Sequence, residues 1–135
     1  MILIACVDDN FGMAFNRRRQ SKDRIVTEKI LEISKGNHLW IAPYSASLFE
    51  DADNLQIDHD FLEKAGEDDY CLVECIDVSH HMERAGNVIL FYWNRKYPSD
   101  VQFPHHLLTE KWTLTEWKTF SGFSHETITM EVYGQ

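Results

Sequence analysis

A short basic run near the amino end holds the side chains best suited to binding chemistry. Residues 16–24 contain five of the thirteen basic residues in a chain whose formal charge is −9. One guanidinium group can donate two parallel hydrogen bonds to a carboxylate or phosphate, so the run is typical of a site for a small anion. The other interpretation is a solvated loop whose arginines pair with acids elsewhere. The ligand-binding candidates in the run are Asn16, Arg17, Arg18 and Arg19.

Asp23 is the candidate for a catalytic carboxylate in the same run. Ser21 is a suitable N-cap, which places Asp23 in the first turn of a predicted helix, where the peptide dipoles favour a negative charge. An ordinary first-turn acid that pairs with Arg24 or Arg19 would have the same sequence pattern, and this alternative stays open.

Metal-binding patterns are weak along the chain. Adjacent histidines occur at 80–81 and 105–106. Neighbouring side chains point in different directions, so such a pair rarely gives two ligands to one metal. A divalent ion at Asp8 and Asp9, where a predicted strand ends, is the least favoured interpretation. We therefore predict no metal site.

A hydrolase-like set of residue types occurs in residues 121–126, Ser-Gly-Phe-Ser-His-Glu. A serine next to a histidine in one short loop does not place its hydroxyl oxygen on the imidazole, so this loop alone is no catalytic triad. Gly122 favours a turn before the last strand. We interpret the loop as structural.

Alternating strand and helix patterns must position these residues. Apolar runs predict buried strands, whereas apolar side chains at helical spacing, ended near glycine, predict helices. We predict a single α/β domain, residues 1–135, with a mixed, mostly parallel central sheet flanked by helices and a C-terminal antiparallel hairpin. The first strand is expected at the centre, between parallel neighbours. The expected strands are residues 1–7, 38–42, 55–57, 70–76, 87–94, 112–120 and 127–133, and the expected helices are residues 21–34, 45–49 and 58–65.

Composition and charge limit the partners. The chain is 44% hydrophobic but has no apolar run of the roughly 18 residues that cross a bilayer, so we expect a cytoplasmic protein without a membrane partner. Residues 50–83 hold twelve acids against one lysine, and such a face repels a phosphate backbone, so broad nucleic-acid binding is not expected. Three cysteines without a secretory signal indicate reduced thiols.

The order of elements, with several short motifs, resembles dihydrofolate reductase. Residues 3–13, Leu-Ile-Ala-Cys-Val-Asp-Asp-Asn-Phe-Gly-Met, are similar to that family's first strand and its Ile-Gly turn. Residues 100–104, Asp-Val-Gln-Phe-Pro, are similar to the family's Asp-Thr-x-Phe-Pro stretch. The resemblance spans nearly the whole chain and implies a divergent protein of this kind, shortened by about one strand between residues 49 and 55.

The resemblance implies a site between segments 12–24 and 42–49. In the family, an acidic residue at the start of the first helix contacts the pterin ring of the substrate, and Asp23 matches it. The carboxyl end of the first strand meets the start of that helix in this fold class, so we expect a pocket there. Arginines replace apolar and proline residues of the family's loop, which implies a more anionic ligand than a folate ring. The expected pocket walls are Ala5, Phe11 and Leu48 or Phe49.

The departures from the family concern its cofactor. The family's Gly-Arg-x-Thr segment, which holds cofactor phosphates, falls at residues 42–45, where only Ser45 offers a hydroxyl. The family's Gly-Gly turn falls after Val73, where this chain has Glu74 and Asp77 nearby. A carboxylate opposes a pyrophosphate, and the absence of glycine prevents close approach of the backbone. We therefore predict no cofactor, with NADPH disfavoured.

The sequence thus predicts a dihydrofolate reductase-like domain without reductase activity. Its expected partner is a small anionic or nucleotide-like ligand near residues 12–24. One alternative is a protein-interaction module or homodimer that uses the aromatic strand at residues 88–93 and has no small-molecule site. A second alternative is an NADPH-dependent reductase.

Overall fold

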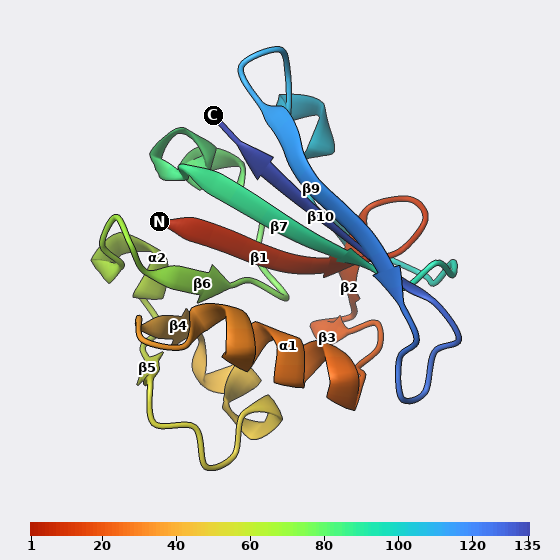
Figure 1. The fold of residues 1–135 in the computed structure, drawn as a ribbon, viewed down its shortest axis with the longest axis horizontal. Helices are drawn as coiled ribbons and strands as arrows, with labels where there is room; N and C mark the ends of the chain where they lie inside the picture. The colour runs from red at the N-terminus through yellow and green to blue at the C-terminus, as the bar shows by residue number, and fades with distance from the viewer.

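Strand β1, Ile2–Val7, runs through the middle of the main sheet (Figure 1), and the computed structural model describes the chain from residue 1 to residue 135. Its two neighbours, β6 (Tyr70–Leu72) and β7 (Asn87–Tyr92), both run parallel to it. Leu3 and Ile4 are fully buried, as expected for a parallel strand covered on both faces. The predicted central position of the first strand is confirmed.

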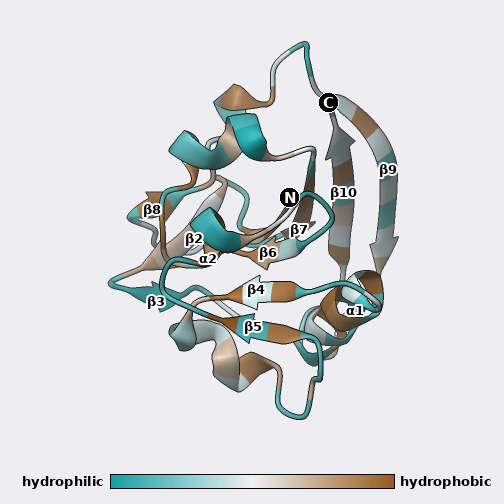
Figure 2. Cartoon of the chain, turned by 90° about the vertical axis from the view of Figure 1, so that its left-hand side faces the viewer, coloured by the Kyte–Doolittle hydropathy of each residue, from teal (hydrophilic) through white to brown (hydrophobic).

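The main sheet has seven strands in the order β5-β4-β6-β1-β7-β10-β9. Strands β4 and β5 continue its parallel half, and Figure 2 shows both as largely hydrophobic. Strand β10 pairs antiparallel with β7, and β9 pairs antiparallel with β10 at the edge. The mixed α/β sheet with a C-terminal antiparallel hairpin is therefore confirmed. The bounds of these strands are Leu39–Ile41 for β4, Leu55–Ile57 for β5, Thr113–Phe120 for β9 and Ile128–Gly134 for β10.

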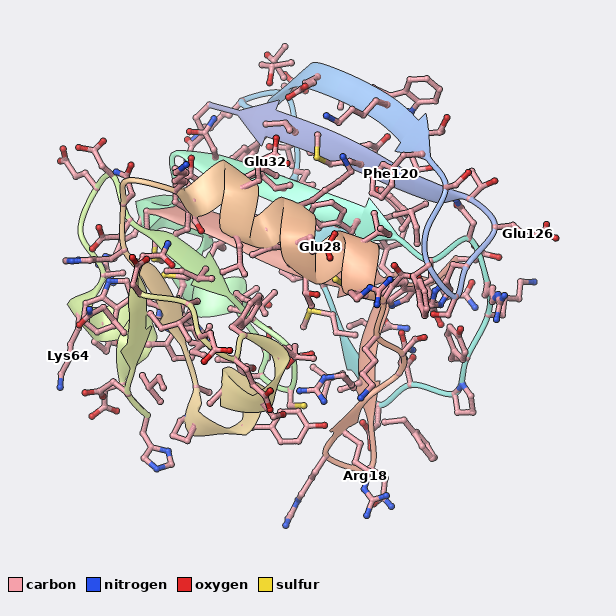
Figure 3. All side chains as sticks on the ribbon, turned by 60° about the horizontal axis from the view of Figure 1, so that its bottom comes forward. Arg18, Glu28, Glu32, Lys64, Phe120 and Glu126 are labelled. Carbon is pink, nitrogen blue, oxygen red and sulfur yellow. The ribbon has the colours of Figure 1, made fainter.

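Helix α1, Arg24–Ser34, lies across one face of the sheet (Figure 1). Val26 and Ile30 are buried there against Ile4 and the neighbouring strands, and charged residues such as Glu28 point outward in Figure 3. The opposite face is covered by the short helix α2, Phe61–Lys64, and the 3₁₀ helix η2, Ser79–Arg84. No helix has the length and apolar character that a bilayer crossing requires.

The start of α1 differs from the sequence prediction. Asp23, rather than Ser21, is the N-cap: its backbone is extended at φ −151°, and its carboxylate accepts the N–H of Ile25 at 2.9 Å. The helix ends as expected near Gly36, which adopts φ +88°, a left-handed conformation that favours glycine. The helix therefore begins two residues later than a Ser21 cap would have placed it.

A second, three-stranded sheet was not predicted. It consists of β3 (Arg18–Arg19), β2 (Gly12–Phe15) and β8 (Val101–Gln102), in that order. Asn16 and Arg17 form the tip of the β2–β3 hairpin with φ values of 52° and 64°, as two-residue hairpin turns require. The basic run is therefore a hairpin that leads into α1, not a plain loop.

Two further elements differ from the sequence predictions. The short helix expected at residues 45–49 is a 3₁₀ helix, η1, at Pro43–Leu48. Strand β6 ends at Leu72 rather than at residue 76, and beyond its end Glu74 is hydrogen-bonded to Arg19. The aromatic strand expected at 88–93 largely coincides with β7, whose residues 88–91 are buried at the centre of the sheet. That strand therefore cannot serve as an interaction surface.

Candidate functional site

A cleft of about 390 Å³ lies where the amino end of α1 meets the end of η1 and the loop 121–127 between β9 and β10. It falls between the two segments that the sequence analysis named. Two cations, three hydroxyls and two apolar groups line it beside Asp23: Lys22, Arg24, Thr27, Ser47, Leu48, Phe123 and Ser124. Its size is within the range of small-molecule sites.

The carboxylate of Asp23 is buried at the base of this cleft and fully hydrogen-bonded. It accepts the backbone N–H groups of Phe123 at 2.9 Å, Ser124 at 2.8 Å and Ile25 at 2.9 Å. The Nδ1 atom of His125 lies 2.9 Å from Oδ2. A carboxylate has about four acceptor positions. Asp23 therefore joins the start of α1 to the β9–β10 loop and has no free acceptor for a ligand.

Hydrogen bonding keeps Asp23 ionised. Burial alone would raise its pKa, but the hydrogen bonds from Phe123, His125, Ser124 and Ile25 outweigh this effect and hold the pKa of Asp23 well below its usual range. Gly122 permits this arrangement, because a Cβ atom there would lie 2.7 Å from Oδ2 of Asp23 and 2.9 Å from the carbonyl oxygen of His125.

His125 connects Asp23 to Ser21, which precedes α1 in the sequence. Its Nε2 atom lies 2.9 Å from Oγ of Ser21, and its ring stacks on Trp93 with the ring centroids 4.6 Å apart. The side chain of His125 is buried. The sequence pattern offers His125 only the neighbouring serine of the same loop, whereas the fold brings Ser21 from 104 residues away. No local spacing signals a contact of that range.

Glu74 accepts hydrogen bonds from two of the predicted ligand-binding residues, Arg19 and Ser45. Its carboxylate accepts Nε of Arg19 at 2.7 Å and a second guanidinium nitrogen at 2.9 Å, a bidentate ion pair. The hydroxyl of Ser45 donates to the same carboxylate at 2.7 Å. The Arg19 guanidinium also lies over the ring of Tyr44, 4.5 Å from its centroid. The structure thus brings Arg19 and Ser45 together around an internal acid.

The remaining predicted residues lie apart from Asp23. Ala5 faces the opposite side of the sheet from α1, because alternate residues of β1 point to opposite faces. Phe11 stacks on His105 with the ring centroids 3.9 Å apart, and Phe49 is buried in the core beneath α1. The exposed tip of the hairpin carries Asn16, Arg17 and Arg18, and Figure 3 shows Arg18 pointing away from the molecule.

Asp8 has a structural role at the end of β1. Its buried carboxylate accepts the backbone N–H groups of Asn10, Gly12 and Tyr97 and the side-chain amide of Gln20. Nowhere does the structure bring three or more His, Cys, Asp or Glu side chains into an arrangement that could hold a metal ion. The same is true of a larger hollow of about 500 Å³ beside β8, whose lining includes Asp77, Asp100, His105 and His106.

No family model and no curated protein match the chain in sequence. Among solved structures, the chain is similar to dihydrofolate reductase from Enterococcus faecalis complexed with NADP(H) and RAB-propyl. The TM-score is 0.70 at 10% sequence identity, and the match covers 98% of this chain and 94% of that one. Similarity at this identity concerns the fold, which agrees with the resemblance found in the sequence. The chain is therefore a divergent protein with the fold of dihydrofolate reductase.

Proposed function

We propose that this chain binds a small anionic ligand in the cleft at the amino end of α1 and does not catalyse nicotinamide-dependent reduction. The observation that carries the proposal is the lining of the cleft. Lys22 and Arg24 provide positive charge, and Ser47 provides a hydroxyl donor. The hydroxyls of Thr27 and Ser124 add to the polar lining but already donate within the protein, to the carbonyl oxygen of Arg24 and to Asp23. An anion in this place would also meet the amino end of α1, where peptide dipoles favour negative charge.

The cations of the cleft have no strong partner within the protein. Arg24 lies 3.9 Å from Glu28, and both side chains are more than 60% exposed, so the pair contributes little. The guanidinium of Arg24 is held over the ring of Phe123, 4.0 Å from its centroid. This contact presents the charge at the cleft without neutralising it. The one acid in the lining, Asp23, is already saturated with donors.

The surroundings of Glu74, in the corner just beyond the ends of β1 and β6, argue against a dinucleotide site. In that corner Glu74 is hydrogen-bonded to both Arg19 and Ser45. A cofactor phosphate there would have to displace Glu74 from Arg19 and lie against a carboxylate. The solved reductase named above was complexed with NADP(H). In this chain Arg19 is already paired with Glu74, which argues against binding of the same ligand there.

The proposal is tested by titrating inorganic pyrophosphate and adenosine monophosphate into the protein, with binding read by calorimetry. The double variant Lys22→Ala/Arg24→Ala should weaken binding at least tenfold. The variant Arg17→Ala/Arg18→Ala removes the same charge from the hairpin tip and is the matched control. It should change the affinity less than twofold. Equal losses in the two double variants, or no binding of either anion by the wild type, would contradict the proposal.

A protein-binding function is the second candidate, because β9 leaves an open sheet edge. Leu114 is 46% exposed and Trp117 is 59% exposed on this strand, and open edges pair readily with other chains. In an antiparallel pair of two β9 strands centred on Trp117, Glu116 of one copy would lie opposite Lys118 of the other. Light scattering of the wild type and of Trp117→Lys tests this: a dimer lost in the variant supports it, and a monomeric wild type excludes self-pairing.

A further inference from the structure

We propose that Ser21 is a nucleophile that accepts an acyl group from small esters, with His125 as its general base and Asp23 as the residue that orients His125. This activity goes beyond ligand binding and does not depend on it, since the substrate class is a neutral carboxylic ester. The three residues occupy the relative positions of a nucleophile, a general base and an orienting acid.

The geometry follows the order of a serine nucleophile, a base and an orienting acid. Oγ of Ser21 lies 2.9 Å from Nε2 of His125, and Nδ1 of the same ring lies 2.9 Å from Oδ2 of Asp23. The serine and the carboxylate thus contact opposite nitrogens of one imidazole. A proton can pass from the hydroxyl to Nε2 while Nδ1 stays bonded to the carboxylate.

The surroundings fix the imidazole in the tautomer that this chemistry needs. Asp23 is ionised and accepts two backbone N–H groups from the loop, at Phe123 and Ser124, so it can only accept from His125. The proton of the neutral ring therefore belongs on Nδ1, and Nε2 is left to accept the hydroxyl of Ser21. Stacking on Trp93 restricts rotation of the ring. The role of Asp23 as the N-cap of α1 does not by itself require the buried His125 or its contact with Ser21.

Ser21 is accessible from the cleft. It is half-buried and lines a narrow recess with Cys6, Val26, Leu72 and Trp93. The recess shares Lys22, Asp23, Thr27 and Leu48 with the wider cleft. Its free volume is about 20 Å³, little more than one water molecule occupies. The recess has room for little more than the reacting carbonyl group, so the rest of a small ester would lie in the wider cleft.

Cys6, the other nucleophile in the recess, is unsuited to the reaction. Burial raises the pKa of its thiol, and the nearby charge of Glu74 raises it further, so the reactive thiolate does not form near neutral pH. Ser21 needs no such ionisation, because His125 removes the proton as the bond to carbon forms. The chemistry of the recess therefore assigns the nucleophile to the serine.

The proposed reaction is balanced in two steps. Oγ of Ser21 attacks the carbonyl carbon while its proton moves to Nε2 of His125, and the ester C–O bond then breaks as the leaving alcohol takes that proton. Water attacks the acylated serine by the same route, giving the carboxylic acid and free Ser21. The oxyanion of each step would form near Lys22, whose positive charge favours it.

The experiment uses two probes on the full chain: a fluorophosphonate, whose adduct is located by peptide mapping, and p-nitrophenyl acetate, whose hydrolysis is followed by absorbance. We expect one fluorophosphonate adduct, on Ser21, and none in Ser21→Ala. His125→Gln should lower both rates at least tenfold, whereas Ser121→Ala, which removes an exposed serine from the same loop, should leave them within twofold. Circular dichroism verifies that each variant is folded.

Three results would overturn the proposal. They are the absence of an adduct on Ser21, an adduct spread over exposed serines, and a folded His125→Gln that reacts as fast as the wild type. Since His125 is buried, its replacement could prevent folding. The wild type labelled in urea then serves instead of the variant: unfolding should abolish the reaction at Ser21, and an undiminished rate would contradict activation by the fold.

Discussion

At the scale of single residues, Asp23 joins two segments that lie far apart in the sequence. Its carboxylate caps α1 through Ile25 and also holds Phe123, which is 100 residues away. A buried N–H group that loses its acceptor costs about 1–3 kcal/mol. One aspartate therefore determines whether the β9–β10 loop closes against the helix, and with it the shape of the cleft.

The depressed pKa of Asp23 makes stability depend on pH. The unfolded pKa of an aspartate is about 3.9, and the folded pKa lies well below it. Ionised Asp23 thus stabilises the fold above the unfolded pKa, and this contribution is lost as the pH falls through that value toward the folded pKa. Urea unfolding at pH 7 and pH 3 should show a smaller loss in Asp23→Asn than in the wild type.

Other acids with lowered pKa values, such as Asp69 and Asp77, titrate in both proteins. The difference between the two curves therefore isolates Asp23. An equal loss of stability in the two proteins would show that the pKa of Asp23 is the same in the folded and the unfolded state.

Gly122 gives a sharper test of the same contact. Any Cβ atom there would lie 2.7 Å from Oδ2 of Asp23, whereas one at Gly86 would meet nothing within 4 Å. We expect Gly122→Ala to lower the free energy of unfolding by about 1–3 kcal/mol and Gly86→Ala to change it by less than about 0.5 kcal/mol. Thermal unfolding of the two variants measures both, and equal effects would contradict the close approach seen at Gly122.

At the scale of elements, the β2–β3 hairpin shows what the sequence could and could not reveal. The basic residues stand out in the sequence, but Arg18 and Arg19 are not part of an apolar alternation that would predict a strand. The hairpin is held by contacts at a distance: Arg19 to Glu74, and the backbone N–H of Asn16 to Asp100. The long apolar strands needed no such contacts, so their pattern alone predicted them.

The ion pair of Arg19 should hold this hairpin against the main sheet. The side chains of Arg19 and Glu74 are 17% and 12% exposed, whereas those of Lys64 and Asp58 are 53% and 28% exposed. Arg19→Met should destabilise the fold by about 2–3 kcal/mol, because it leaves a mostly buried carboxylate without its cation. The matched change Lys64→Met should have little measurable effect. Urea unfolding compares them, and similar midpoints would argue against a structural role for Arg19.

At the scale of the whole molecule, the fold was predictable and the cleft was not. The order of strands and helices follows from local apolar patterns, and the resulting fold matches that of the solved reductase at 10% identity. The contact between Ser21, Asp23 and His125 requires the β9–β10 loop to meet the start of α1, which no spacing in the sequence encodes. Segments 12–24 and 42–49, which border the cleft, could be named in advance, but the contribution of loop 121–127 and the partners of each side chain depend on the closed fold.

The charge of the whole molecule and the corner at Glu74 together oppose a nicotinamide dinucleotide. A formal charge of −9 disfavours the approach of any anion at long range. In the cleft, Lys22 and Arg24 offset this repulsion locally, whereas beside Arg19 the carboxylate of Glu74 repels phosphates at contact. We expect a dissociation constant for NADPH weaker than about 1 mM, or about −4 kcal/mol, by tryptophan fluorescence. NADPH and dihydrofolate together should be consumed no faster than without protein. Added salt, which screens only the long-range part, should not produce tight binding, because Glu74 remains. A low-micromolar constant or measurable turnover in the wild type would instead place this chain among working reductases.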